Sequence, residues 1–173
     1  MNKRFIPFCV AKSIYDIDPI FFKKHQISIL FVDLDNTLDA HNKSHPSDRA
    51  LALKDKLAIS DIEMIVVSNN TSKRVSTYAK ELGVRYAGSL LKPFAFRLKK
   101  FIKANKIDIS KVMMIGDQII TDVCCGNGAG IKVILTERLV DDDQWTTKFN
   151  RFFDKPRYKK LRKLNLLTKW EDK

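Results

Sequence analysis

Two aspartates separated by one residue follow a mostly apolar run near the start of the chain. Asp33 and Asp35 open the segment 33–38 (Asp-Leu-Asp-Asn-Thr-Leu), directly after the run 27–32. Such a run is typical of a buried strand, and open α/β sheets bind ligands at the carboxyl ends of their strands. A carboxylate at that edge can attack a phosphoryl group, and a second one two residues on can transfer protons. Because unpaired buried charge is costly, the pair indicates either a bound divalent cation or a polar turn capped by Asp35.

Polar groups also follow the second and third predicted strands. Ser68 and Asn69 end the apolar run 63–67, where a hydroxyl and backbone amides can donate hydrogen bonds to phosphoryl oxygens. Lys92 precedes a helix expected over 93–104, which places a cation beside the positive end of a helix. These residues favour a phosphate site at the same edge of the sheet.

Two further aspartates follow the fourth predicted strand, 111–115. Asp117 can complete a magnesium site with Asp33 and leave positions for phosphate and water. Asp122, taken alone, would be interpreted more simply as a helix cap. The order of all these residues after successive strands favours one shared site.

Strand and helix patterns alternate along the chain. This alternation predicts an α/β fold with a five-stranded, mainly parallel sheet between helix layers. Near the end, apolar residues at helical spacing predict two short helices separated by Pro156. The predicted strands are 27–34, 63–67, 84–87, 111–115 and 131–135, and the predicted helices include 47–57, 93–104 and one that ends at Gly83.

Length and composition indicate one folded domain without a membrane span. The chain has 173 residues, 45% of them hydrophobic, and no apolar run approaches the ~18 residues of a membrane helix. Its three cysteines form no Cys-x-x-Cys pair, which favours reduced thiols in the cytoplasm. The start of the chain does not have the pattern of a signal peptide, because its apolar part is short and Pro7 interrupts it.

The formal net charge of +12 is concentrated in two basic stretches, 92–106 and 151–163. Both stretches can be solvated helix faces, which is the usual role of charge runs. They can equally hold a polyanion or an anionic membrane surface. Composition alone leaves both interpretations open.

The motifs at the four strand ends resemble those of the haloacid dehalogenase-like (HAD) phosphatases. The matching segments are 33–38, 68–70, 92–93 and 116–122. The resemblance extends over nearly the whole chain, including the segments 13–18 and 147–151, to the YqeG family, which is related to the mitochondrial phosphatidylglycerophosphate phosphatases. It implies a HAD-like Rossmannoid three-layer sandwich and Mg²⁺ as the cofactor.

The same resemblance implies a role for each site residue. Asp33 would be the nucleophile that forms an aspartyl-phosphate, and Asp35 the general acid that later activates water. The remaining expected roles are phosphate binding for Ser68, Asn69 and Lys92, magnesium binding for Asp33, Asp117 and the backbone carbonyl of Asp35, and support of Lys92 or of a metal-bound water for Asp122. Two positions depart from the family pattern: Asp39, where an apolar residue is expected, and Gly128, where an arginine is expected.

The resemblance divides the single domain into three parts and leaves no room for a cap domain. We expect an N-terminal extension over 1–26, a catalytic core over 27–136 and a C-terminal helical extension over 137–173. Since short connections separate the motifs, the site would be open to a large substrate. A lipid, a polynucleotide or a phosphoprotein is then favoured over a small phosphate ester.

Phosphatidylglycerophosphate at the inner face of the membrane is the preferred substrate, with the protein cytoplasmic and peripheral. The basic excess would attract anionic headgroups. Aromatic and apolar residues near the start could enter the membrane interface, although core packing is preferred for most of them; they are Phe5, Ile6, Phe8, Phe21 and Phe22. Nucleic acid is a lower-ranked partner, and a binding protein that keeps the fold without turnover is a further alternative.

Overall fold

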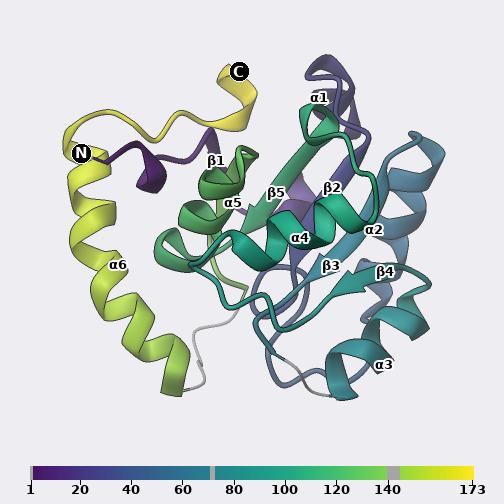
Figure 1. Ribbon diagram of the computed structural model, residues 1–173. Coiled ribbons are helices and arrows are strands. Elements are labelled where there is room, and N and C mark those ends of the chain that lie inside the picture. The colour runs from purple at the N-terminus through teal and green to yellow at the C-terminus, as the bar shows by residue number, and fades with distance from the viewer. Residues whose placement is uncertain (1, 71–72, 140–144) are drawn as a thin grey trace.

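The computed structural model describes residues 2–70, 73–139 and 145–173, and it contains a six-stranded sheet between helices (Figure 1). The strand order is β1-β6-β5-β2-β3-β4, and every neighbouring pair is parallel. The predicted α/β class and parallel sheet are therefore confirmed. The strands are β1 (Cys9–Ala11), β2 (Ile29–Asp33), β3 (Glu63–Val67), β4 (Arg85–Ala87), β5 (Val112–Gly116) and β6 (Lys132–Thr136).

One of the six strands, β1, comes from the N-terminal segment and was not predicted. It pairs with β6 in the register Cys9↔Ile134, so this part of the chain forms one edge of the sheet. Pro7 lies close before this strand, and proline in a segment argues against a strand, so the sequence did not indicate one here. The expected sheet of five strands is thus extended by one.

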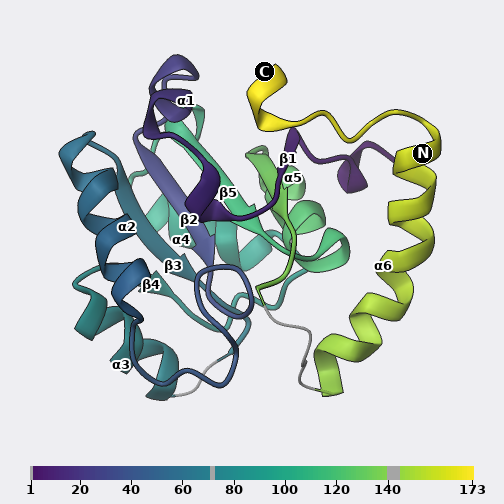
Figure 2. The same cartoon turned by 180° about the vertical axis from the view of Figure 1, so that it is seen from behind.

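The sheet is buried on both faces, which makes three layers. Alternate strand residues point to opposite sides, so Phe31 and Ile65 join one hydrophobic cluster while Leu30 and Val66 join the other. One face is covered by α1 (Pro19–Lys24), α2 (Asp48–Ile59) and α3 (Lys73–Leu82). The other is covered by α4 (Phe96–Ala104), α5 (Cys124–Ala129) and α6 (Trp145–Lys163), and Figure 2 gives the view from behind.

The connections between the strands contain no cap domain in the described chain. Between β2 and β3 the helix is α2, and between β3 and β4 it is α3. Short 3₁₀ turns lie at Lys3–Phe5, Ile14–Asp16, Ile109–Lys111 and Trp170–Asp172, and a π-helical turn at Ile119–Val123 precedes α5. This confirms the uncapped architecture expected from the short spacing of the motifs.

Helix α4 begins later than predicted. Its first residue is Phe96 rather than Pro93, and its N-cap, Ala95, makes no side-chain cap hydrogen bond. The Lys92–Pro93 peptide bond is cis, and both residues lie in the loop before the helix. The expectation that Lys92 stands at the positive end of a helix starting at Pro93 is therefore wrong.

Helix α6 continues through Pro156, where a break was predicted. Contacts outside the helix compensate for the hydrogen bond that proline cannot donate. The carboxylate of Asp154 accepts hydrogen bonds from the backbone N–H groups of Ile119 (3.0 Å) and Ile120 (2.9 Å), and Leu161 is fully buried. Tertiary packing thus decides the length of this helix.

The N-terminal aromatic residues pack into the protein. Phe21 and Phe22 are buried in the core, while Phe5, Ile6 and Phe8 are partly buried against it. These contacts favour core packing over insertion into a membrane for this group. No helix in the described part of the chain combines the length and the apolar character that crossing a membrane requires.

Candidate functional site

Three neighbouring strands bring the predicted site residues to one edge of the sheet. Asp33 is the last residue of β2, Ser68 follows β3, and Asp117 follows β5. Because β2 pairs with β5 on one side and with β3 on the other, these residues lie at adjacent strand ends. The juxtaposition expected from the order of the motifs is present.

Lys92 lies buried between two of the predicted carboxylates. Its Nζ donates hydrogen bonds to Asp33 Oδ1 at 2.5 Å and to Asp122 Oδ1 at 2.7 Å. Burial alone lowers the pKa of Lys92, but the carboxylates of Asp122 and Asp33 outweigh burial and raise that pKa above its ordinary value. Lys92 is therefore a fixed cation.

Asp33 is surrounded by negative charge. Burial raises the pKa of Asp33 well above its usual range, and the carboxylates of Asp122, Asp117 and Asp35 add to this rise, while Lys92 opposes it. An additional cation at this position would favour the ionised form of Asp33.

The residues present fit a divalent cation. Carboxylate oxygens of Asp33, Asp117 and Asp122 lie within 4.8 Å of one another, and all three residues are buried. Three carboxylates against the one ammonium of Lys92 leave a formal charge of −2, and carboxylate oxygens are ligands that Mg²⁺ accepts. Since Asp122 Oδ1 accepts from Lys92 and Oδ2 accepts from the Gln118 N–H, Asp33 and Asp117 are the better candidates to bind the ion.

Gly116 allows Asp122 to reach this site. A Cβ at position 116 would lie 2.4 Å from both Cβ and Cγ of Asp122, a separation that real side chains do not adopt. Asp122 lies in the π-helical turn, where the Val123 N–H donates to the Gln118 carbonyl at 3.2 Å and the Asp122 N–H donates to the same carbonyl at 3.0 Å. Gly116 is thus required by the close approach of the Asp122 side chain.

Asn69 supports Lys92 directly. Its Oδ1 accepts from the Lys92 N–H at 2.6 Å, and its Nδ2 donates to the Lys92 carbonyl at 2.9 Å. Ser68 is buried next to it, and its Oγ accepts from the Asn70 N–H at 3.0 Å. The predicted phosphate-binding pair therefore includes a side chain, Asn69, that holds the backbone of Lys92.

Arg74 is a site residue that the sequence did not indicate. Its Nη2 donates to Asp35 Oδ1 in an ion pair, and its Nη1 donates to the Lys43 carbonyl at 2.8 Å. Arg74 lies in the first turn of α3, far from Asp35 along the chain, and no local pattern marks it. Only the fold brings the two residues together.

The two residues that depart from the family pattern, Asp39 and Gly128, each fit their local surroundings. Asp39 is buried, and its Oδ2 accepts from the Tyr78 hydroxyl at 2.6 Å and the Ser47 N–H at 2.9 Å, which ties the loop after β2 to α2 and α3. At position 128, a Cβ would lie 2.5 Å from a guanidinium nitrogen of Arg4. Glycine at this position leaves room for Arg4 against α5.

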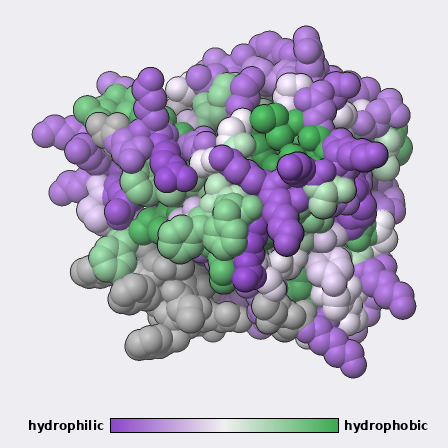
Figure 3. All heavy atoms as spheres, in the orientation of Figure 1, coloured by the Kyte–Doolittle hydropathy of each residue, from purple (hydrophilic) through white to green (hydrophobic). Residues whose placement is uncertain are grey.

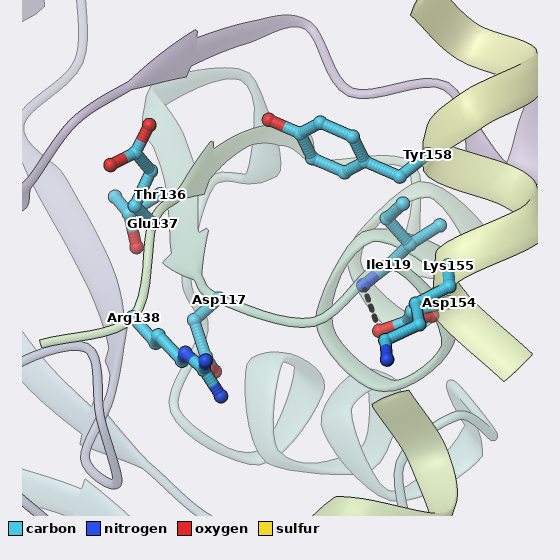
Figure 4. Close-up of a pocket in the computed structure, with 8 residues that line it drawn as sticks. All are labelled: Asp117, Ile119, Thr136, Glu137, Arg138, Asp154, Lys155 and Tyr158. Carbon is cyan, nitrogen blue, oxygen red and sulfur yellow. Dashed lines mark hydrogen bonds between the residues drawn. The ribbon is translucent and has the colours of Figure 1, made fainter. Parts of the chain in front are cut away.

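A cavity of about 250 Å³ lies beside Asp117, between the carboxyl end of β6 and α6 (Figure 4). We call it the β6–α6 cavity. Asp117 belongs both to its wall and to the carboxylate cluster. The cavity was not predicted, because it is formed by segments distant in the sequence.

Comparison with known proteins agrees with the site geometry. The HAD-hydrolase-like family model matches residues 90–158. The probable phosphatase YqeG of Bacillus subtilis (strain 168) is 28% identical over 151 residues, which cover 87% of this chain and 88% of that protein. The chain is therefore similar to HAD-like hydrolases over residues 90–158 and to a probable phosphatase over most of its length.

Solved structures show that this chain has the HAD fold. The deoxy-D-mannose-octulosonate 8-phosphate phosphatase of Haemophilus influenzae aligns with a TM-score of 0.52 and 16% identity, over 67% of this chain and 81% of that chain. The putative 3-deoxy-D-manno-octulosonate 8-phosphate phosphatase of Vibrio cholerae aligns with a TM-score of 0.53 and 17% identity, over 75% of this chain and 78% of that chain. At this identity the likeness concerns the fold.

Proposed function

We propose that this protein is a HAD-like phosphatase, which hydrolyses a phosphomonoester through an aspartyl-phosphate on Asp33. The observation that carries the proposal is the buried cluster in which Lys92 binds both Asp33 and Asp122 next to Asp117. A nucleophilic carboxylate, a fixed cation and a set of metal-binding oxygens are the groups that phosphoryl transfer requires. A protein that only bound a ligand would gain no stability from such clustered acids.

In the first step, Asp33 attacks phosphorus. The bond between an Asp33 carboxylate oxygen and phosphorus forms, the ester P–O bond breaks, and Asp35 gives a proton to the leaving alcohol. Lys92 and Ser68 donate hydrogen bonds to the phosphoryl oxygens. Asn69 is the positioning residue that holds the Lys92 backbone.

In the second step, water attacks the phosphorus of the aspartyl-phosphate. Asp35 accepts the proton of that water, the bond between phosphorus and the Asp33 oxygen breaks, and inorganic phosphate is released. Arg74 fixes the Asp35 carboxylate that must donate and then accept the proton.

Asp33 and Asp117 would hold Mg²⁺, together with the backbone carbonyl of Asp35. When bound, Mg²⁺ offsets the negative charge of the cluster and polarises the phosphoryl group. A structure with this fold, the 3-deoxy-D-manno-octulosonate 8-phosphate phosphatase of Moraxella catarrhalis, is in complex with a magnesium ion and a phosphate ion. The carboxylate cluster of this chain supports the same type of ion.

Phosphatidylglycerophosphate at the inner membrane face is the substrate we propose. The absence of a cap domain in the described chain leaves the site open to a headgroup at a surface. Three exposed apolar side chains flank the Lys92 loop: Leu91 (45% exposed), Phe94 (64%) and Phe96 (58%). The net charge of +12 favours an anionic membrane.

Phosphate release from phosphatidylglycerophosphate in mixed micelles with Mg²⁺ tests the proposal. Asp33→Asn should lower the rate on the order of a thousandfold. Asp61→Asn, the same change at an exposed residue, should leave it unchanged. Removal of Mg²⁺ with a chelator should abolish release by the wild type.

The other outcomes separate mechanism from substrate. Asp33-dependent release from an aryl phosphate without release from the lipid would support the phosphatase mechanism and contradict the lipid substrate. The substrate would then be a polynucleotide, a phosphoprotein or a small phosphate ester. Equal rates for Asp33→Asn and the wild type would overturn the aspartyl-phosphate mechanism.

A further inference from the structure

Helix α6 contacts the π-helical turn that carries Asp122. The two oxygens of the Asp154 carboxylate each accept one backbone hydrogen bond, from the Ile119 N–H at 3.0 Å and from the Ile120 N–H at 2.9 Å. Figure 4 shows Asp154 on α6 facing Ile119, and Asp117 also lies on the wall of the β6–α6 cavity. A side chain of the C-terminal extension thus reaches the segment between Asp117 and Asp122.

The two N–H groups that Asp154 binds lie at the start of a helical segment. The first N–H groups of a helix have no partner within the helix, and the side chain of the residue before it commonly accepts from one of them. In this chain that residue is Gln118, which makes no side-chain cap hydrogen bond. Asp154 therefore supplies the cap from a different helix.

A carboxylate is well suited to cap this turn. The π-helical turn runs directly into α5, so the two together form a continuous helical segment over 119–129. The start of a helix carries a partial positive charge, and hydrogen bonds to an ionised acceptor are stronger than those to a neutral one. Asp154 thus stabilises the position of the turn more strongly than a neutral side chain of the same size would.

The position of this turn determines where two carboxylates of the site lie. Asp117 lies just before the turn, and Asp122 lies within it. The Asp122 carboxylate accepts from Lys92 Nζ at 2.7 Å and from the Gln118 N–H at 3.1 Å. A shift at the start of the turn would therefore displace Asp117 and Asp122 relative to Lys92.

We propose that Asp154 is a positioning residue of the carboxylate cluster, which holds Asp117 and Asp122 in place through the backbone of Ile119 and Ile120. This inference rests on the proposed function, because it takes the cluster to be the Mg²⁺-binding part of a phosphatase site. Asp154 acts through the turn, since each of its oxygens accepts from a backbone N–H group. The C-terminal helical extension is then a part of the site.

Mg²⁺ binding, measured by titration calorimetry without substrate, tests the positioning role. Asp154→Ala removes both acceptors, and we expect the dissociation constant for Mg²⁺ to rise about tenfold, as is typical when a residue that orients metal ligands is lost. Asp154→Asn keeps the size of the side chain and one acceptor oxygen, so its effect should be smaller. Wild-type affinity in both variants would overturn the proposal.

Asp108→Ala is the matched control, because it also removes an aspartate that caps a turn. The Asp108 carboxylate accepts from the Ser110 N–H at 3.0 Å and caps the 3₁₀ turn that leads into β5. This turn precedes the first residue of β5, whereas Asp117 follows the last, so Mg²⁺ affinity should stay at the wild-type value. An equal loss of affinity in Asp108→Ala and Asp154→Ala would overturn the proposal, since it would reflect general destabilisation.

Hydrogen exchange of the metal-free protein measures the turn itself. In Asp154→Asn at least one of the Ile119 and Ile120 amides loses its acceptor, and we expect it to exchange about tenfold faster than in the wild type. The amide of Phe31, in the central strand β2, is the internal reference and should change less. Equal acceleration at all three amides would overturn the proposal, because it would show that the whole fold is destabilised.

Neither measurement requires turnover, so failure of this inference can be distinguished from failure of the proposed function. Hydrolysis by Asp33→Asn at the wild-type rate would overturn the aspartyl-phosphate mechanism. The Mg²⁺ affinity and the exchange rates of the Asp154 variants would still decide whether Asp154 positions the carboxylate cluster.

Discussion

The side chain of Asn69 holds the backbone of the loop that carries Lys92. Asn69 satisfies both the N–H and the carbonyl of the Lys92 backbone, while the side chain of Lys92 reaches Asp33 and Asp122. A buried backbone group that loses its partner costs about 1–3 kcal/mol. The position of the Lys92 ammonium is therefore determined partly by Asn69, a residue that need not touch a substrate.

Asn69→Ala should accordingly affect the site more than the fold. We expect kcat/KM for an aryl phosphate to fall about tenfold to a hundredfold, since small misplacements of catalytic groups are costly. Inhibition by inorganic phosphate should weaken in parallel. Asn105→Ala, at the exposed end of α4, is the control and should change neither value. Wild-type phosphate inhibition in Asn69→Ala would contradict the positioning role.

The buried thiols make stability depend on pH in the alkaline range. Burial raises the pKa of Cys9 from 9.0 to about 12, and burial likewise raises that of Cys125 to about 12. In the unfolded chain the thiols ionise near their ordinary pKa, whereas the folded state keeps them protonated. Their contribution to the free energy of unfolding is thus complete below about pH 9 and is lost as the pH rises toward 12.

Denaturant unfolding at pH 8 and pH 10.5 measures this loss. The Cys9→Ala and Cys125→Ala double variant should lose less stability between the two pH values than the wild type. The comparison removes the contribution of other groups that titrate in the same range. An identical pH dependence in both proteins would contradict the assignment to the thiols.

At the level of elements, α5 packs on β6 through a glycine. A Cβ at position 126 would lie 2.4 Å from Cγ2 of Val133, and the next contact, Met114 Sδ, would lie at 3.2 Å. Overpacking of this kind costs about 1–3 kcal/mol. Gly126→Ala should therefore lower the free energy of unfolding by an amount in that range.

A double-mutant cycle tests whether the Val133 methyl group is the cause. Val133→Ala removes the clashing atom, so adding Gly126→Ala to it should cost much less than in the wild type. Urea denaturation of the four proteins gives the coupling. Additive losses would mean that the cost of Gly126→Ala arises elsewhere.

The sequence predicted the elements with strong local patterns and missed those that depend on distant contacts. The apolar runs before Asp33 and after Glu63 predicted β2 and β3, because strands buried on both faces read as continuous apolar segments. Strand β1 was missed because Pro7 lies close before it and only its pairing with the distant strand β6 identifies it. The continuation of α6 past Pro156 was missed because Asp154 and Leu161 stabilise it from outside.

The site residues divide in the same way, into those that the sequence predicted and those whose roles depend on distant contacts. Asp33, Ser68 and Asp117 could be placed together from sequence, because each follows a strand and the carboxyl ends of parallel strands meet. The Arg74–Asp35 ion pair and the two hydrogen bonds from Asn69 to Lys92 join separate loops. No spacing rule connects such pairs, so these roles required the structure.

At the scale of the whole molecule, an exposed apolar patch lies beside the site edge. It consists of Leu91, Phe94 and Phe96, in and next to the loop that carries Lys92. Figure 3 shows apolar side chains gathered near the middle of the face that bears α4, with hydrophilic side chains around them. Arg97 adds a cation there, 5.8 Å from the centre of the Phe96 ring. This combination suits the interface of an anionic membrane.

Replacing both aromatic residues should weaken membrane binding without damaging the chemistry. We expect Phe94→Ser with Phe96→Ser to lower binding to anionic vesicles about tenfold in a sedimentation assay and to slow hydrolysis of micellar lipid. Aryl phosphate hydrolysis should be retained, because both side chains are exposed whereas the carboxylate cluster is buried. Ile59→Ser, at an exposed position (84%) at the end of α2, is the control. Vesicle binding equal to that of the wild type would contradict a docking role for the patch.

The edge strand β1 has a consequence for how the chain folds. It pairs with β6, and the Val10 N–H donates to the Thr168 carbonyl at 2.8 Å, so β1 is held between two segments that are far away in sequence. Closing such large loops costs entropy before any contact repays it, and domains rich in non-local parallel pairings fold slowly. We therefore expect the central strands to form the folding nucleus and this edge to close late. In native-state hydrogen exchange, the amide of Val10 should accordingly open at a lower free energy than those of β2.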